Sequence, residues 1–314
     1  MTTVYSREVG SMYRLGQTTI LEIRGRDRSK VLNNVATQDL RTLEVGQAFE
    51  TFITETKGRS LGHGIAVGLP DRHLFVTVPG QGERLFAHLD RFIIMEDAVV
   101  KDISSTFSVW LARTDSDFPD LLGTAPGQKK SIEYSIDGEA VIGVWAPWVG
   151  ESSSLLLVPS GIEASLMSKC SSNLVDSDLV GRSEWEAQRI ANFWPWYGQD
   201  FDDKNLPQEV DRNDQAISFN KGCYLGQETI ARLDALGQVQ KKLVRLKLDT
   251  DVLPDLADPS QVALLSDETE VGQLKSVAKD VSGGVVGIGM VKRSHFLPGT
   301  SLVAGQARIP VQIQ

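Results

Sequence analysis

The last quarter of the chain, beyond Gly237, consists of short stretches that favour β-strands. Five such stretches are separated by Asp, Pro, Gly and Ser, and they cover residues 242–248, 262–265, 271–278, 285–291 and 302–314. No helical pattern occurs among them, and short strands joined by turns pair antiparallel. This segment of about 75 residues therefore predicts a small antiparallel β-barrel at residues 241–314.

The preceding residues, 1–240, mix strands with helices but lack a regular alternation of the two. A strand pattern at 18–24 comes first, and three more at 49–56, 65–67 and 74–78 are joined by tight turns, which predicts an antiparallel meander. Apolar residues at helical spacing predict helices that begin after Asp27 and span 81–95, 162–171 and 177–192, and further strands are expected at 99–103, 107–112, 140–145 and 155–158. This mixture indicates the α+β class. Because 314 residues exceed one ordinary core, we expect two or three domains.

Charge and composition argue against several classes of function. The formal net charge of −9 disfavours non-specific binding of nucleic acid, whose phosphates would be repelled. No apolar run approaches the roughly 20 residues that span a bilayer, and residues 1–8 lack the pattern of a signal peptide. With only two cysteines in the chain, a disulfide framework is not expected, and we predict a reducing, cytoplasmic location.

One segment, Lys221 to Glu228, combines features that favour chemistry. Its sequence is Lys-Gly-Cys-Tyr-Leu-Gly-Gln-Glu, in which Gly222 and Gly226 flank Cys223 and allow a sharp turn or the close approach of a ligand. Residues 227–236 predict a short helix that ends at Gly237. The thiol would then lie just before a helix N-terminus, and together with Lys221 this would favour the thiolate.

The groups around the thiol leave several readings open. Gln227 and Glu228 supply an amide and a carboxylate, and Arg232 can pair with Glu228 or with an anionic ligand. A lone cysteine is also often a small buried apolar residue, and this is the interpretation we give to Cys170. The four histidines lack ligand spacing and no Cys-x-x-Cys occurs, so no intrinsic metal is expected. A Cys–His pair formed in the fold stays open.

The octapeptide, followed by Ala231-Arg232 and Gly237, resembles the signature of the YgfZ family of folate-binding proteins. These are relatives of the glycine-cleavage T-protein, an aminomethyltransferase. The similarity extends over nearly the whole chain, through segments that include 25–39, 197–200, 206–209, 217–219, 271–272 and 287–300.

The resemblance implies a three-domain ring around a channel for tetrahydrofolate. Residues 1–240 would form two interleaved α+β modules that end in the octapeptide, and 241–314 the barrel. The family acts in folate-dependent assembly or repair of iron–sulfur enzymes, including enzymes that modify tRNA. By this resemblance Cys223 would be the essential thiol, assisted by Lys221. Tetrahydrofolate, or a one-carbon derivative, would contact Gly222, Tyr224, Gly226, Gln227, Glu228, Arg232, Arg189 and Trp196.

Two of these assignments have plainer alternatives. Arg189 either binds the folate tail or is a solvated helix arginine, and Trp196 either stacks on the pterin or belongs to the core. Partners implied by the family are iron–sulfur enzymes or assembly proteins as clients; neither direct nucleic-acid binding nor a membrane is expected.

A departure from the T-protein pattern bears on enzymatic activity. True aminomethyltransferases carry an Asp at the start of the helix after the third meander strand, and Leu85 aligns with it here. Leucine cannot hydrogen-bond a folate nitrogen or stabilise a cation. A true aminomethyltransferase is therefore not expected, and a folate-dependent one-carbon transferase with an unknown substrate is the alternative to the maintenance factor.

Overall fold

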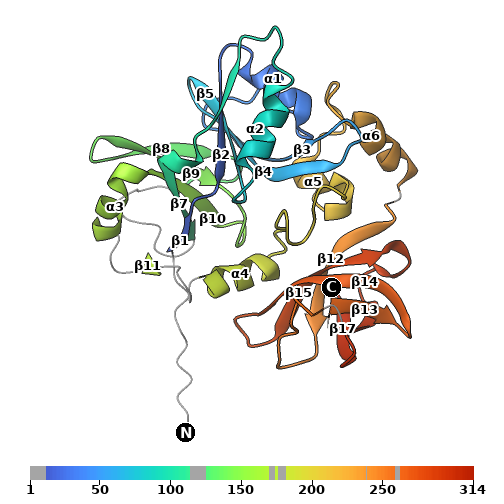
Figure 1. Cartoon of the computed structure of the whole chain (residues 1–314). Helices are drawn as coiled ribbons and strands as arrows, with labels where there is room; N and C mark the ends of the chain where they lie inside the picture. Colours follow the sequence, from blue (N-terminus) through green and yellow to red (C-terminus); the bar gives the residue numbers. More distant parts are fainter. Residues whose placement is uncertain (1–11, 114–124, 170–173, 176–181, 238, 259–261) are drawn as a thin grey trace.

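The computed structural model consists of two open β-sheets and one closed barrel, with short helices packed around them (Figure 1). It describes residues 12–113, 125–169, 174–175, 182–237, 239–258 and 262–314. The predicted α+β class with a C-terminal antiparallel barrel is confirmed. Among the helices of these residues, none has the length and apolar character needed to cross a bilayer.

The first sheet has the strand order β3-β4-β5-β2-β6, and all its neighbours are antiparallel. Its strands are β2 (Thr19–Arg24), β3 (Ala48–Thr54), β4 (Ser60–Gly68), β5 (Arg72–Thr77) and β6 (Val99–Asp102). Helices α1 (Arg28–Val35) and α2 (Gly82–Asp90) cover one face, where Leu32 and Leu85 pack with Phe75. The period-2 alternation of the strands sends the other apolar set to the opposite face.

The second sheet packs against that opposite face, and both sheets share one apolar core. Ile65 and Val76 of the first sheet lie in the same cluster as Val109, Val144 and Leu155 of the second. Its strand order is β11-β1-β7-β10-β9-β8, formed by β1 (Met12–Gly16), β7 (Phe107–Arg113), β8 (Ser131–Ile136), β9 (Glu139–Trp145), β10 (Ser153–Pro159) and β11 (Leu174–Val175). Because β1 belongs to this sheet, the two sheets are interleaved along the chain.

The third unit is a closed six-stranded barrel in the order β12-β15-β14-β13-β16-β17. Its strands are β12 (Lys241–Leu248), β13 (Ala263–Ser266), β14 (Thr269–Lys279), β15 (Val285–Lys292), β16 (Ser301–Ala304) and β17 (Ile309–Ile313). The single strand expected over 302–314 is wrong, because a turn at Gly305, with a φ of 63°, divides it into a hairpin. The division of the chain into domains at 240/241 stays a prediction.

Helix boundaries differ most from the sequence expectation. The helix predicted for residues 81–95 ends at Asp90, since the chain then turns and places Ile94 and Met95 in solvent. Asp27 precedes α1, but its carboxylate accepts the backbone N–H of Asp97 and does not cap the helix. The remaining α-helices are α3 (Glu163–Lys169), α4 (Arg182–Ala191), α5 (Asn213–Ala216) and α6 (Gln227–Leu236). Cys170 lies outside the described residues.

Arg189 of α4 ties the barrel to the rest of the molecule. Its fully buried guanidinium donates to the carboxylate of Asp200 at 2.7 Å and to the hydroxyl of Ser276, on barrel strand β14, at 3.0 Å. Further bonds go to Glu186 and to the carbonyl of Trp194. Asp200 also accepts the backbone N–H of Trp196 at 2.7 Å. A buried charge that is fully hydrogen-bonded in this way fixes the geometry of the groups that surround it.

We expect Arg189→Met to lower the free energy of unfolding by about 3–5 kcal/mol, because it leaves the buried Asp200 carboxylate without its cation. Urea unfolding measures the change. Arg26→Met is the matched control, since Arg26 pairs with Asp97 at the surface and should cost less than about 1 kcal/mol. Equal effects of the two substitutions would contradict the assigned role of Arg189.

Stability should also depend on His73, which is buried on β5 with Nε2 2.7 Å from the Ser29 hydroxyl. Burial, helped by the nearby positive charge of Arg28, lowers the pKa of His73 from 6.5 to about 4. Between these two values the unfolded chain binds more protons than the folded one, so the free energy of unfolding falls as pH decreases from 6.5 to 4. His73→Gln should reduce this fall by up to about 3 kcal/mol, measured by urea unfolding at both pH values.

Candidate functional site

The segment around Cys223 is an irregular loop whose shape depends on the buried ammonium of Lys221. Lys221 is 5% exposed, and its Nζ donates to the backbone carbonyls of Asn33 at 2.9 Å, Ala36 at 2.7 Å and Gln38 at 2.8 Å. The first two carbonyls lie at the C-terminal end of α1. The last carbonyls of a helix have no N–H partner within the helix, and their partial negative charge attracts a cation. Burial lowers the pKa of Lys221 to about 7, while Asp39 opposes this. Lys221 thus anchors the loop.

A second anchor follows the cysteine. The backbone N–H of Leu225 donates to the Asn34 carbonyl at 2.9 Å, and the Leu225 carbonyl accepts from the Thr54 hydroxyl at 2.7 Å. Next to it, Gly226 has a φ of 78° and packs so closely on the turn between β3 and β4 that a Cβ would meet the Cα of Gly58 at 2.3 Å. Only glycine combines this conformation with this contact.

Cys223 lies between the two anchors, and its side chain is exposed. The loop is therefore held on both sides while the sulfur faces solvent. Tyr224 is half-buried, and its ring lies 4.7 Å from the Lys221 ammonium. Helix α6 begins at Gln227 and ends at Leu236, as predicted from the sequence, with Gly226 and Gly237 in left-handed conformation at its two ends. The thiol precedes the first turn of this helix.

Three of the predicted ligand-binding side chains lie on α6. Glu228 and Arg232 are exposed and Gln227 is partly exposed. Within the part of the chain that the structure describes, their side chains form no hydrogen bond or ion pair, including the Glu228–Arg232 pair expected from the sequence. An amide, a carboxylate and a guanidinium on the helix that follows Cys223 are consequently available to a ligand.

Two other predicted residues lie elsewhere. Arg189 is buried at the joint with the barrel, where carboxylate, carbonyl and hydroxyl partners already occupy its guanidinium. Trp196 packs against Trp148 and Trp185, with ring centroids 5.1 and 5.3 Å apart, in the core shared by the two sheets. The Arg189 guanidinium lies 5.8 Å from the Trp196 ring, and among the described residues no hydrogen bond, ion pair or ring contact joins either residue to positions 221–228.

Leu85 is fully buried on α2, and its methyl groups lie 3.2 and 3.3 Å from where a Cβ on Gly62 of β4 would be. No carboxylate occupies this position of the helix. The polar side chains next to it along the chain point elsewhere: Glu83 is exposed, and Arg84 pairs with Asp203 at 3.5 Å. The side chain at this position of α2 can therefore neither form a hydrogen bond nor stabilise a positive charge.

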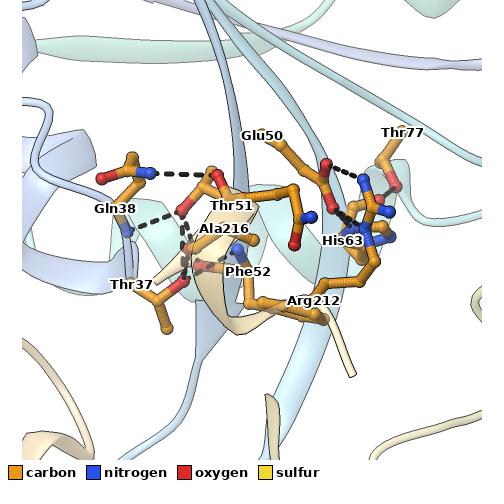
Figure 2. A network of polar contacts seen from close by, with 10 residues as sticks. Thr37, Gln38, Glu50, Thr51, Phe52, His63, Thr77, Arg212 and Ala216 are labelled. Atoms are coloured by element: carbon orange, nitrogen blue, oxygen red, sulfur yellow. Dashed lines mark hydrogen bonds and ion pairs between the residues drawn. The ribbon is translucent and has the colours of Figure 1, made fainter. Parts of the chain in front are cut away.

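Sequence reasoning missed a buried ionic network formed by Glu50, His63 and Arg212 (Figure 2). Glu50 Oε1 lies 2.8 Å from both His63 Nε2 and Arg212 Nε, and Arg212 Nη2 donates to Oε2 at 2.5 Å. Burial alone would raise the pKa of Glu50, but hydrogen bonds from Arg212 and His63 hold it below its usual value. Trp194 covers the network, with its ring 4.9 Å from the imidazole and 5.1 Å from the guanidinium.

The left side of Figure 2 shows how the same region holds the chain just before the loop. Thr37 donates its hydroxyl to the Ala216 carbonyl at 2.6 Å, and its own carbonyl accepts the backbone N–H of Ser218 at 3.0 Å. The segment after α1 therefore binds residues 216–221 at several points, of which the last is Lys221. The only sequence signal for the network is that Glu50 is a polar residue within a predicted strand. His63 lies two residues before the next predicted strand, and no pattern specifies Arg212 as a partner of either residue.

Neither of two surface cavities is lined by the predicted ligand-binding residues. One of about 400 Å³ adjoins the loop and is lined by residues 38, 129, 213, 214 and 217–220. The other, of about 240 Å³, lies between α4 and the barrel. In the described ranges, no cluster of three or more His, Cys, Asp or Glu residues could hold a metal ion.

Comparison with known proteins relates this geometry to other chains. No family model matches the chain. It is 26% identical over 301 residues to the chloroplast protein At1g60990 of Arabidopsis thaliana, which carries the name of a transferase; the match covers 91% of this chain and 66% of that protein, just under two thirds of its length. It is 23% identical over 261 residues to the tRNA-modifying protein YgfZ of Colwellia psychrerythraea, covering 77% of this chain and 76% of that one.

A shorter match and a solved structure complete the comparison. Over 58 residues, 18% of this chain and 12% of the other, it is 48% identical to the mitochondrial iron–sulfur cluster assembly factor IBA57 of Saccharomyces cerevisiae. The crystal structure of the glycine cleavage system aminomethyltransferase T from Bartonella henselae superimposes with a TM-score of 0.83, covering 98% of this chain and 86% of that one at 16% identity. The chain is a YgfZ-like protein with the aminomethyltransferase fold.

For this YgfZ-like protein we expect Lys221→Met to lower the free energy of unfolding by about 2–4 kcal/mol, because three buried carbonyls lose their donor. Lys204→Met, which replaces an exposed lysine, is the control and should change it by less than about 0.5 kcal/mol. Urea unfolding gives both values. A Lys221→Met protein as stable as the control would show that the ammonium is not the anchor of the loop.

Proposed function

We propose that this chain binds tetrahydrofolate, or a one-carbon derivative, and uses Cys223 in the assembly or repair of iron–sulfur enzymes, including enzymes that modify tRNA. The observation that carries the proposal is the exposed thiol of Cys223, held between two anchored positions in the octapeptide. The names of two relatives, an iron–sulfur cluster assembly factor and a tRNA-modifying protein, support it. Its partners would be iron–sulfur proteins in the cytoplasm.

The residues near the thiol suit one end of a folate. Glu228 can accept the N–H groups of a pterin and Arg232 can pair with a carboxylate, and neither side chain has a partner among the described residues. Glu228 and Arg232 lie one helical turn apart, with about 5–6 Å between their Cβ atoms. Folate is much longer than this, so the two side chains can hold only one end of it. Bound there, folate would supply a one-carbon unit, and Arg189 would take no part in holding it because its guanidinium is occupied.

The alternative, a one-carbon transferase with an unknown substrate, draws on the aminomethyltransferase fold and on the transferase name of the Arabidopsis relative. The buried Leu85 argues against aminomethyl transfer, because nothing at that position of α2 can stabilise developing positive charge. Turnover of 5,10-methylenetetrahydrofolate by the purified protein alone would favour the alternative.

Calorimetric titration with 5-formyltetrahydrofolate tests the folate site. Wild type should bind, and Arg232→Met should weaken binding about tenfold, because it removes a charge-assisted hydrogen bond. Arg91→Met, which replaces an exposed arginine at the end of α2, is the matched control and should bind as wild type does. No binding by the wild type would overturn the folate part of the proposal.

The role of the thiol is tested separately. Cys223→Ala and Cys223→Ser should bind folate but fail to restore the activity of an iron–sulfur tRNA-modifying enzyme in a strain that lacks this protein. Neither substitution should destabilise the fold, because the side chain is exposed. Full restoration by both variants would refute a chemical role for Cys223.

A further inference from the structure

Between its two anchors, the loop leaves its backbone unpaired. The N–H of Ser218 donates to the Thr37 carbonyl and that of Leu225 to the Asn34 carbonyl. In the described chain, no N–H from Phe219 to Tyr224, and no carbonyl from Phe219 to Cys223, takes part in a hydrogen bond with the protein. Asn220, Gly222 and Cys223 are exposed. Residues 219–221 form a turn and a bend, so the free donors and acceptors available to a second backbone are those of residues 222–224.

The two glycines that flank Cys223 differ in what requires them. Gly226 has positive φ and a backbone contact that excludes any side chain. Gly222 has neither: its φ lies outside the left-handed region, and a Cβ there would meet nothing within 4 Å. The fold itself therefore does not need glycine at 222. The open space over this residue and its unpaired N–H and carbonyl groups is where another molecule can approach the backbone closely.

A cavity of about 400 Å³ continues from this backbone on its N-terminal side. Phe219, 40% exposed, supplies an aromatic surface in it, and Ser218, Asn220 and Gln38 supply neutral hydrogen-bonding groups. Lys129 and Asp214 contribute one charge of each sign. Neutral amide and hydroxyl groups around one apolar anchor match a polypeptide, whereas a nucleic acid would require a concentration of cations.

We propose that residues 219–224 bind an extended segment of a partner polypeptide, which pairs with the backbone at Gly222 and places an apolar side chain on Phe219. The segment then passes directly over the Cys223 sulfur. This inference deepens the proposed function, on which it rests, by assigning how a client polypeptide is held beside the Cys223 thiol. Such pairing is tolerant of the partner's sequence, because main-chain groups supply the hydrogen bonds.

The probe is a five-residue peptide with capped ends, apolar neighbours and one central cysteine held as a mixed disulfide with 5-thio-2-nitrobenzoate. The Cys223 thiolate attacks the cysteine sulfur of the peptide; a new disulfide joins peptide and protein, the old one breaks, and the coloured thionitrobenzoate thiolate leaves without net oxidation. The same mixed disulfide of a capped single cysteine serves as reference. Wild type should react about tenfold faster with the peptide than with the reference, as two backbone hydrogen bonds predict.

Gly222→Val should bring this ratio close to one by covering the backbone, and taking the ratio to the single cysteine cancels any effect of the valine on the thiol itself. Gly161→Val is the matched control, since a Cβ at that exposed glycine also meets nothing within 4 Å, and it should keep the wild-type ratio. A peptide with N-methylated amides on both sides of its cysteine should react with wild type no faster than the single cysteine does. This measurement uses only the wild-type protein, so it tests the inference even where Gly222→Val fails to fold.

A wild-type ratio near one, an unchanged ratio in a folded Gly222→Val protein, or no effect of N-methylation would each overturn the inference. None of these measurements involves folate or an iron–sulfur protein. If the protein does not bind folate but still reacts faster with the peptide, the proposed function is refuted and the peptide site stands. If it binds folate but shows no preference for the peptide, the peptide site is refuted and the proposed function stands.

Discussion

The buried ammonium of Lys221 is the interaction on which the candidate site depends. Three carbonyls around the end of α1 would be without donors in the absence of Lys221, and a cation buried there would be costly in the absence of those carbonyls. Each side therefore satisfies the other. The consequence is geometric: a loop that would otherwise be free at the surface is held on the first sheet, and Cys223, two residues further along, is exposed in a defined place.

The same principle recurs at two other places in the central segment of the chain. Arg212 joins that segment to Glu50 and His63 of the first sheet, and Arg189 joins it through Asp200 to Ser276 of the barrel. In each case a buried cation satisfies groups from elements distant in sequence. Ionic contacts of this kind contribute more to a unique arrangement than to net stability, because desolvation offsets most of their attraction. They position the elements around the loop, while apolar cores hold each sheet and the barrel together.

The chain has the fold of an aminomethyltransferase, and Leu85 stands at the position of α2 that the family resemblance assigns to that enzyme's aspartate. Leu85 is part of a packed core, so a charged residue there would require its own partner. Among the residues that the structure describes, this scaffold presents the exposed thiol of Cys223, three polar side chains on α6 without partners and a stretch of unpaired backbone.

Sequence by itself determined the features that depend on local pattern: the α+β class, most barrel strands, helix α6 and the glycine-flanked thiol. The alternation of apolar and polar residues, helical spacing and turn residues each involve only a few neighbouring positions, so they can be recognised in the sequence. Only the tertiary structure decided that Lys221 points away from solvent to carbonyls 183–188 residues earlier, that Arg189 is a structural joint, and that Glu50, His63 and Arg212 meet. It also separated Gly226, which the fold requires, from Gly222, which it does not. Such contacts follow from how sheets pack and cross, and no local pattern encodes them.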